Sequence, residues 1–219
     1  MQQEEIRMRN PWLDVSVDDY EAHMALPEVA QTQALSAFMD SAFREFMPES
    51  LGVIGCTTGT GFEHIDPVHT RRVVGIDINP VFLDILKTRF QSKLTGLELL
   101  EADVSDGKFG IEPVELVFAG LLFEYVDIEK ALLNISRSLT FGGHLVAALQ
   151  LQSKDSAAVT PTPYKSLEIL APVLNLVPPA EFSRVCSEVG LKEIRTENIP
   201  LKKGKSFFVG YYEKLPIKS

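Results

Sequence analysis

The fold of this chain is decided by LGVIGCTTGTGFEHIDPVHTRRVVGIDINP, residues 51–80. These residues follow the order of a strand, a glycine-containing turn, a helix and a second strand that ends in Asp77. This order is typical of α/β proteins that bind a nucleoside, because the turn lets the backbone approach the ligand closely. An acid at the end of the second strand can accept hydrogen bonds from ribose hydroxyls. The segment therefore predicts a nucleoside site at the carboxyl ends of these two strands.

The rest of the chain alternates short apolar segments with segments of helical periodicity. Strands are expected at residues 52–55, 73–78, 97–102, 114–119, 144–149, 191–198 and 206–213, and helices at 29–46, 60–65, 81–94, 128–139 and 180–189. Asn79-Pro80 is expected to start the third of these helices, and Gly142-Gly143 to end the fourth. Such alternation implies parallel strands joined by right-handed crossovers, which is an α/β fold with a doubly wound sheet.

Length and composition predict a single domain. The chain has 219 residues, of which 45% are hydrophobic, enough for one full core and too few for two. Within a domain of residues 1–219 we expect an N-terminal helical cover at residues 1–48. Residues 153–180 contain five prolines and predict a loop-rich lid.

The charge balance constrains partners. The chain has 21 basic and 30 acidic residues, a net charge of −9, which argues against binding to nucleic acid backbones and favours a small molecule or a protein as substrate. Its start does not resemble a signal peptide, and its longest apolar segment, 114–123, is too short to cross a bilayer, so we expect a cytoplasmic protein without membrane contact. Cys56 and Cys186 lack the spacing of a disulfide framework, and no metal site is indicated. The oligomeric state is not predicted.

Five motifs in order resemble those of the class I S-adenosylmethionine-dependent methyltransferases. They are GCTTGTG (55–61), GIDINP (75–80), LEADVSD (100–106), VELVFAGLLFEYV (114–126) and SLTFGGHLV (138–146), and the resemblance extends over residues 51–213. It implies a Rossmann-like, mostly parallel sheet of seven strands in the order 3-2-1-4-5-7-6 with an antiparallel strand seven. The closing hairpin expected after Gly190 fits this topology.

The resemblance implies S-adenosylmethionine as cofactor, with Asp77 on the ribose and Asp103 beside the adenine amino group. Tyr20 is included because in relatives an N-terminal segment folds across the cofactor and an aromatic residue contacts it. The full predicted cofactor set is Gly55, Thr57, Gly59, Asp77, Ile78, Asp103, Val104, Gly120 and Tyr20. Asp77 as a helix cap and Asp103 as a turn residue are the simpler structural interpretations.

Two residues are candidates for catalysis of methyl transfer to a small-molecule acceptor. Transfer from a sulfonium is an in-line displacement that mainly needs alignment and exclusion of water. A base helps where the acceptor is a hydroxyl or an acidic carbon. Glu124 follows the fourth strand, where the acceptor normally enters, and His23 has an ordinary pKa near neutrality. The alternatives are that Glu124 only stabilises a helix start and that His23 is a surface or core residue.

Two other functions remain open. The family usually has an acid where this chain has Val53, and a glycine where it has Thr57. These differences allow a catalytically inactive methyltransferase-like binding or partner protein. A nicotinamide-dependent Rossmann enzyme is a further alternative, although the turn reads G-x-x-x-G-x-G instead of G-x-G-x-x-G. Oxygen, nitrogen and carbon acceptors are all compatible with the fold.

Overall fold

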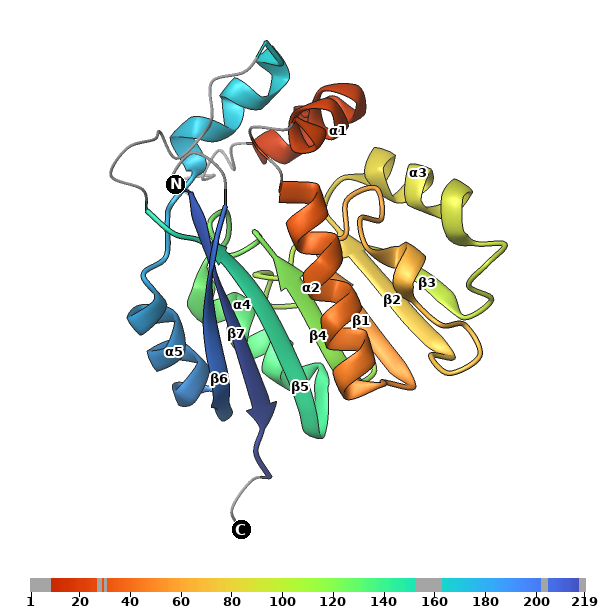
Figure 1. Cartoon of the computed structure of the whole chain (residues 1–219), viewed down its shortest axis with the longest axis vertical. Helices are drawn as coiled ribbons and strands as arrows, with labels where there is room; N and C mark the ends of the chain where they lie inside the picture. The colour runs from red at the N-terminus through yellow and green to blue at the C-terminus, as the bar shows by residue number, and fades with distance from the viewer. Residues whose placement is uncertain (1–8, 27–28, 30, 153–162, 202–204, 217–219) are drawn as a thin grey trace, which may run out of the picture.

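The protein is described by a computed structural model, in which residues 9–26, 29, 31–152, 163–201 and 205–216 are placed. Its centre is a seven-stranded sheet with the order β3-β2-β1-β4-β5-β7-β6 (Figure 1). The strands are β1 (Ser50–Ile54), β2 (Arg72–Asp77), β3 (Leu97–Glu101), β4 (Val114–Gly120), β5 (Leu139–Gln150), β6 (Leu191–Pro200) and β7 (Ser206–Lys214). Strand β7 runs antiparallel to both of its neighbours, β5 and β6. The predicted fold class and strand order are confirmed.

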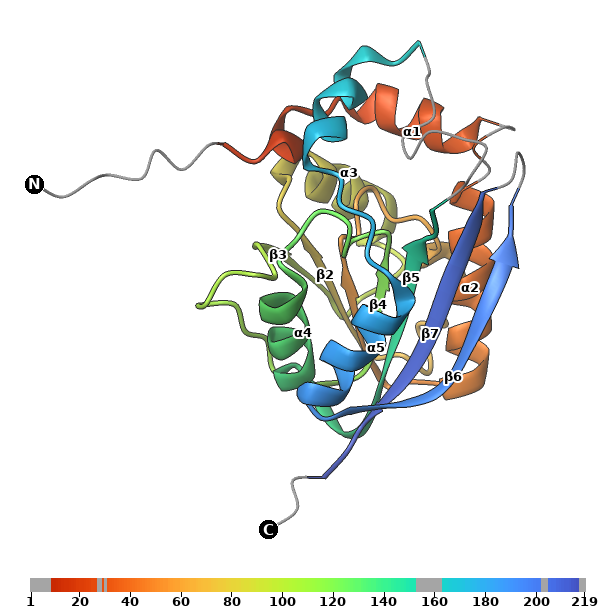
Figure 2. The same ribbon diagram turned by 90° about the vertical axis from the view of Figure 1, so that its left-hand side faces the viewer.

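Helices cover both faces of the sheet (Figures 1 and 2). The α-helices are α1 (Val17–Ala25), α2 (Gln31–Phe46), α3 (Pro80–Phe90), α4 (Ile128–Arg137) and α5 (Pro179–Glu188), and the 3-10 helices are η1 (Pro11–Asp14), η2 (Phe62–His64) and η3 (Lys165–Val173). Buried side chains of α2 and α3 form one apolar cluster with one face of the sheet, and those of α4 and α5 form another with the opposite face. The inner strands β1, β2, β4 and β5 are therefore largely buried on both faces, whereas the edge strands β3 and β6 are mostly exposed or half-buried.

The helix expected at residues 60–65 is wrong. Between β1 and β2 the described chain forms turns and the three-residue η2. Gly59 and Gly61 have φ angles of 97° and 85°, which an α-helix does not allow. A Cβ atom on Gly61 would lie only 2.4 Å from the Met39 sulfur. The turn thus packs its backbone directly against α2, in the space that a side chain would need.

The role expected for Gly142-Gly143 is also wrong. Helix α4 already ends at Arg137, and both glycines lie inside β5. Pairing of β5 with β4 passes from Leu139 directly to His144, so the intervening residues fold out of the ladder. A Cβ atom on Gly143 would lie 2.9 Å from the Thr140 carbonyl oxygen, which explains why this bulge needs glycine. In contrast, the start of α3 is confirmed, because the Asn79 side chain accepts a hydrogen bond from the Val81 amide at 2.9 Å.

Three segments cover the carboxyl ends of the strands: η1, α1 and η3 (Figure 2). Val15, Leu167 and Leu170 pack together with Phe82 of α3 in a small apolar cluster. The Ser166 amide donates a hydrogen bond to Asp19 at 3.2 Å and so joins η3 to α1. Residues 1–8, 27–28, 30 and 153–162 of the predicted cover and lid lie outside the described residues.

Candidate active site

A pocket lies between this cover and the carboxyl ends of the strands. Its empty space is about 1180 Å³, including the part open to solvent. The terminal residues Ile54 of β1, Asp77 of β2, Gly120 of β4 and Gln150 of β5 all line it. Of the predicted site residues, Gly55, Thr57, Asp77, Ile78, Asp103, Val104, Gly120, Tyr20, His23 and Glu124 line it as well. Parallel strands that end at one edge bring these distant residues together.

Asp77 is the buried acid of the pocket, with 7% of its surface exposed. Its Oδ2 accepts a hydrogen bond from the Thr57 amide at 2.8 Å, and its Oδ1 accepts one from the Asn79 amide at 2.9 Å. Burial raises the pKa of the Asp77 carboxyl group, while these backbone hydrogen bonds oppose the rise. Each oxygen retains a second lone pair, so the fixed carboxylate can still accept hydrogen bonds from a ligand.

The glycine turn is held in an unusual conformation at Thr57, whose φ angle is 46°. A β-branched residue rarely has a positive φ angle. The Tyr20 hydroxyl donates a hydrogen bond to Thr57 Oγ1 at 3.5 Å, which connects α1 to the turn. Burial raises the pKa of Tyr20 to about 12, so its hydroxyl stays protonated near neutral pH. Gly59 is not among the pocket residues; a Cβ atom there would lie 2.7 Å from the Phe90 ring.

The β3 side of the pocket combines one acid with apolar walls. Asp103 Oδ1 accepts hydrogen bonds from the Ser105 amide at 2.8 Å and from the Ser105 hydroxyl at 2.6 Å. Ile78, which follows Asp77 in the sequence, and Val104, which follows Asp103, also line the pocket. A flat, apolar ring with a polar edge would match these neighbours.

Glu124 occupies the β4–β5 side of the pocket and is only 2% exposed. Its Oε1 accepts a hydrogen bond from the Gln150 amide at 2.6 Å. Its Oε2 is buried and has no hydrogen-bond partner among the described residues. Burial raises the pKa of the Glu124 carboxyl group to about 7, although the hydrogen bond from Gln150 opposes the rise. The carboxyl group is therefore neither fully ionised nor fully protonated near neutral pH.

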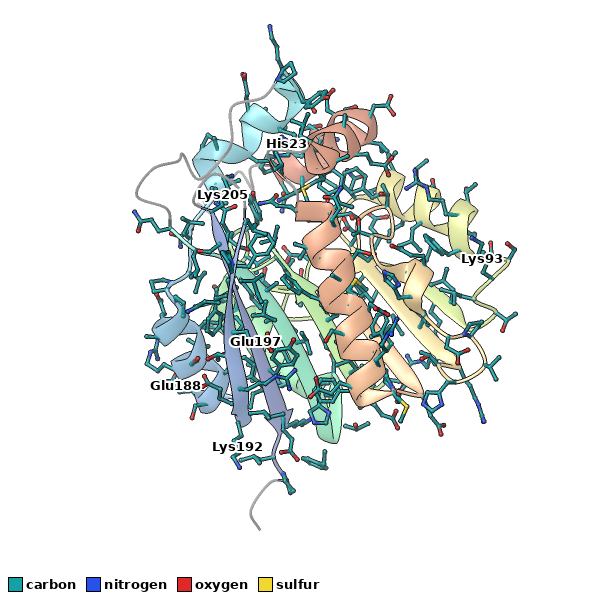
Figure 3. The ribbon with its side chains drawn as sticks, in the orientation of Figure 1. His23, Lys93, Glu188, Lys192, Glu197 and Lys205 are labelled. Atoms are coloured by element: carbon teal, nitrogen blue, oxygen red, sulfur yellow. The ribbon has the colours of Figure 1, made fainter. Side chains whose placement is uncertain are left out.

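His23 and Lys205 lie near each other at the cover end of the sheet (Figure 3). Desolvation, and then the charge of Lys205, lower the pKa of His23, which favours neutral imidazole at pH 7. Lys205 is 5% exposed. Lys202 and Lys203 lie outside the described residues.

Sequence reasoning missed the aromatic part of the cover and the polar pair behind Glu124. The Trp12 ring packs edge-on against Tyr125, with centroids 5.0 Å apart, and the Trp12 carbonyl accepts a hydrogen bond from the Asn79 side chain at 2.9 Å. Gln31 donates from Nε2 to Gln150 Oε1 at 3.3 Å. Asn10-Pro11 before Trp12 was a helix-start signal, whereas nothing local in the sequence brings Gln31 to Gln150.

The described residues contain no group of three or more His, Cys, Asp or Glu side chains placed to hold a metal ion. None of the helices placed in the structure is long and apolar enough to cross a bilayer.

Comparison with known proteins agrees with the geometry. A family model described as a methyltransferase domain matches residues 53–147, from β1 into β5. No curated protein sequence matches the chain significantly. Many solved structures share the fold. The N-methyltransferase NodS from Bradyrhizobium japonicum WM9, in complex with S-adenosyl-l-homocysteine, is 15% identical, with 94% of this chain and 99% of that chain covered and a TM-score of 0.66.

Two other structural neighbours differ in the activities that their names state. Geranyl diphosphate C-methyltransferase from Streptomyces coelicolor A3(2), in complex with Mg²⁺, geranyl diphosphate and S-adenosyl-L-homocysteine, is 15% identical, covers 92% of this chain and 88% of its own, and has a TM-score of 0.65. The [4+2]-cyclase SpnF is 12% identical, covers 84% and 82%, and has a TM-score of 0.66. At such identities these likenesses establish the shared fold, and the reaction must be argued from the site.

Proposed function

We propose that this chain, whose residues 53–147 match a methyltransferase domain, is a class I, S-adenosylmethionine-dependent enzyme that methylates a small-molecule acceptor in the pocket described above. The observation that carries the proposal is the placement of Asp77, Asp103 and Glu124 around one pocket beneath the cover. The first two carboxylates lie at the β2 and β3 ends, and the third lies beyond the β4 end. One side of the pocket can therefore hold a nucleoside while the other admits an acceptor.

The residues present fit S-adenosylmethionine. Asp77 is fixed by two backbone amides and keeps free lone pairs for ribose hydroxyls. Asp103 beside Ile78 and Val104 suits the amino edge and the faces of adenine. Gly55, with a φ angle of 70°, and Thr57 belong to the β1 turn, whose backbone would contact the middle of the ligand. Bound S-adenosylmethionine supplies an electrophilic methyl group on a positively charged sulfur.

The protein contributes alignment and exclusion of water. The cover is fixed to the nucleotide half of the pocket, because Glu21 of α1 accepts hydrogen bonds from the Thr58 hydroxyl at 2.6 Å and from Arg89 Nη2 of α3 at 3.1 Å. The half-buried ring of Tyr20 and the buried ring of Phe82 have their centroids 5.3 Å apart. Removing water from a site of this kind strengthens every polar interaction within it.

Glu124 and His23 are the proposed bases for this reaction. Near pH 7 both side chains lack the extra proton for part of the time, as a general base must. Glu124 is better placed, because it lines the pocket and its buried Oε2 has no hydrogen-bond partner among the described residues. His23 also lines the pocket but lies beside Lys205, whose charge opposes proton uptake.

Calorimetry with S-adenosylmethionine and S-adenosylhomocysteine tests the cofactor part of this proposal. We expect micromolar or tighter dissociation constants for both. A panel of hydroxyl, amine and carbon acceptors, assayed by transfer of a labelled methyl group, tests the reaction. No binding of either cofactor form at high micromolar concentration would contradict the proposal.

A further inference from the structure

We propose that the methyl acceptor is a primary or secondary amine on a largely apolar molecule, and that Glu124 binds its N–H group and takes its proton. This inference rests on the proposed methyltransferase function, which leaves the acceptor open. The acceptor class follows from the charges, the wall residues and the unpartnered Glu124 Oε2 on the β4–β5 side of the pocket.

Glu124 Oε2 has no hydrogen-bond donor among the residues that the structure describes. Its partner Oε1 is fixed by the Gln150 amide, so the carboxyl group cannot turn away from the pocket without losing that bond. The Glu124 carbonyl oxygen accepts a hydrogen bond from the Asn175 amide at 2.8 Å, which fixes the backbone from the opposite side. A buried polar atom without a partner costs about 1–3 kcal/mol. A ligand that donates an N–H to Oε2 would remove this cost.

The charges of the pocket favour a positively charged acceptor. Its described lining contains Asp77, Asp103 and Glu124 but no lysine or arginine. Lys205, which is not among the lining residues, lowers the pKa of His23 through its charge. A phosphate or carboxylate acceptor would thus meet carboxylates without a counter-charge, at a high desolvation cost. An ammonium group would instead form an ion pair with the Glu124 carboxylate.

Part of the wall on this side is apolar. The aliphatic lining side chains contributed by the cover and by α2 are Met24, Leu35, Leu167, Leu170 and Leu174, while His23 and Gln31 add polar groups. Two of them, Leu167 and Leu170, are at most 6% exposed and belong to the cluster that holds the cover in place. These walls would bury the hydrocarbon part of the acceptor, at about 25 cal/mol for each Å² removed from water.

The pKa of the Glu124 carboxyl group also suits proton transfer from an amine acceptor better than from an alcohol. A group with a pKa of about 7 can accept a proton from an ammonium ion, but it is too weak a base for an aliphatic alcohol. An ammonium nitrogen has no lone pair, so the Glu124 carboxylate first takes one N–H proton from the bound ammonium ion. The freed nitrogen lone pair then forms the new N–C bond while the C–S bond breaks, and sulfur keeps that electron pair as a neutral thioether. The products are a methylated ammonium ion, S-adenosylhomocysteine and a neutral carboxyl group, so charge and protons balance.

The test uses matched probes with the full chain saturated with S-adenosylhomocysteine. A series of alkyl- and phenylalkylamines of increasing length is compared with the alcohols and carboxylates of the same carbon skeletons, by calorimetry at pH 7.5. We expect at least one amine to bind 10-fold or more tightly than its matched carboxylate. Glu124→Gln should weaken that amine 10-fold or more and abolish its methylation. The matched control is Glu129→Gln, which removes an exposed carboxylate of α4 and should change neither.

Several outcomes would overturn this inference. They are equal or tighter binding of the carboxylates, amine binding that survives Glu124→Gln, and failure of every amine to bind. A loss of S-adenosylhomocysteine affinity in Glu124→Gln, with amine binding unchanged, would instead assign Oε2 to the cofactor. Failure of the wild-type protein to bind S-adenosylhomocysteine would refute the proposed function itself, so the two failures are distinguishable.

Discussion

Replacing Glu124 with glutamine should change how the stability of the ligand-free protein depends on pH. Burial raises the pKa of Glu124 from its ordinary value of 4.5 to about 7 in the folded protein. A raised folded-state pKa means that the folded state binds the proton more tightly than the unfolded state. Its contribution to the free energy of unfolding is therefore fully present below pH 4.5 and is lost as the pH rises to about 7. Above that pH both states are ionised and the effect is constant.

The size of the effect follows from the same values. One pKa unit corresponds to about 1.4 kcal/mol, so the full difference between the two states is about 3 kcal/mol. The sequence pI is about 5.0, where solubility is low, so the useful window begins near pH 5.5. Between pH 5.5 and 7 the free energy of unfolding of the wild type should fall by about 2 kcal/mol relative to Glu124→Gln.

Urea denaturation of both proteins from pH 5.5 to 8.5, without cofactor, measures this difference. The absolute stability of Glu124→Gln also includes the cost of its buried amide N–H groups, but that cost does not vary with pH. Glu129→Gln, with an exposed side chain, should run parallel to the wild type throughout. Curves for Glu124→Gln and wild type that stay parallel within about 0.5 kcal/mol would refute the buried, partly protonated carboxyl group.

Three further results are expected. Asp77→Asn should weaken S-adenosylhomocysteine binding by about 10- to 100-fold in calorimetry, since charged hydrogen bonds contribute about 1.5–3 kcal/mol each, while exposed Asp84→Asn should bind as the wild type does. Thr57→Gly should remove a backbone strain of about 1–3 kcal/mol and leave stability within about 1 kcal/mol of wild type in urea denaturation, because glycine costs entropy in return; a loss above about 3 kcal/mol would contradict this. Cys56 and Cys186 are buried with raised thiol pKa values, so neither should react with a thiol reagent at pH 8 until the protein is unfolded; rapid reaction of the native protein would show that this packing is wrong.

The sequence predicted the sheet well because its signals are local. Each buried strand is a short apolar run, and Asn79-Pro80 started α3 as expected. The two errors arose where glycines serve tertiary packing. Gly61 makes room for Met39 of α2, and Gly143 makes room for a bulge in β5, and neither partner is near in sequence. A glycine that ends a helix and one that admits a distant side chain look the same in a single sequence.

The site was predictable to the extent that strand ends define it. The pocket residues at the ends of β2 and β4, Asp77 and Gly120, could be identified because their positions follow from topology alone. Trp12 and Gln31 could not, because they reach the pocket through the fold of the cover, whose arrangement is set by packing against Phe82 and by hydrogen bonds such as that to Gln150. Positions fixed by the sheet are thus readable from sequence, whereas positions fixed by the cover require the structure.

The two departures from the family pattern have different consequences in this fold. Val53 is 3% exposed and packs in the apolar cluster of α2 and α3, so the residue itself contributes to the core and not to the pocket. Thr57, in contrast, lines the pocket, and its amide still donates to Asp77 despite the positive φ angle. Asp77 therefore keeps its hydrogen bond from the turn. What the pattern loses is a carboxylate near the end of β1, and Glu124 beyond β4 is then the one acid at the β1, β4 and β5 ends among the described pocket residues.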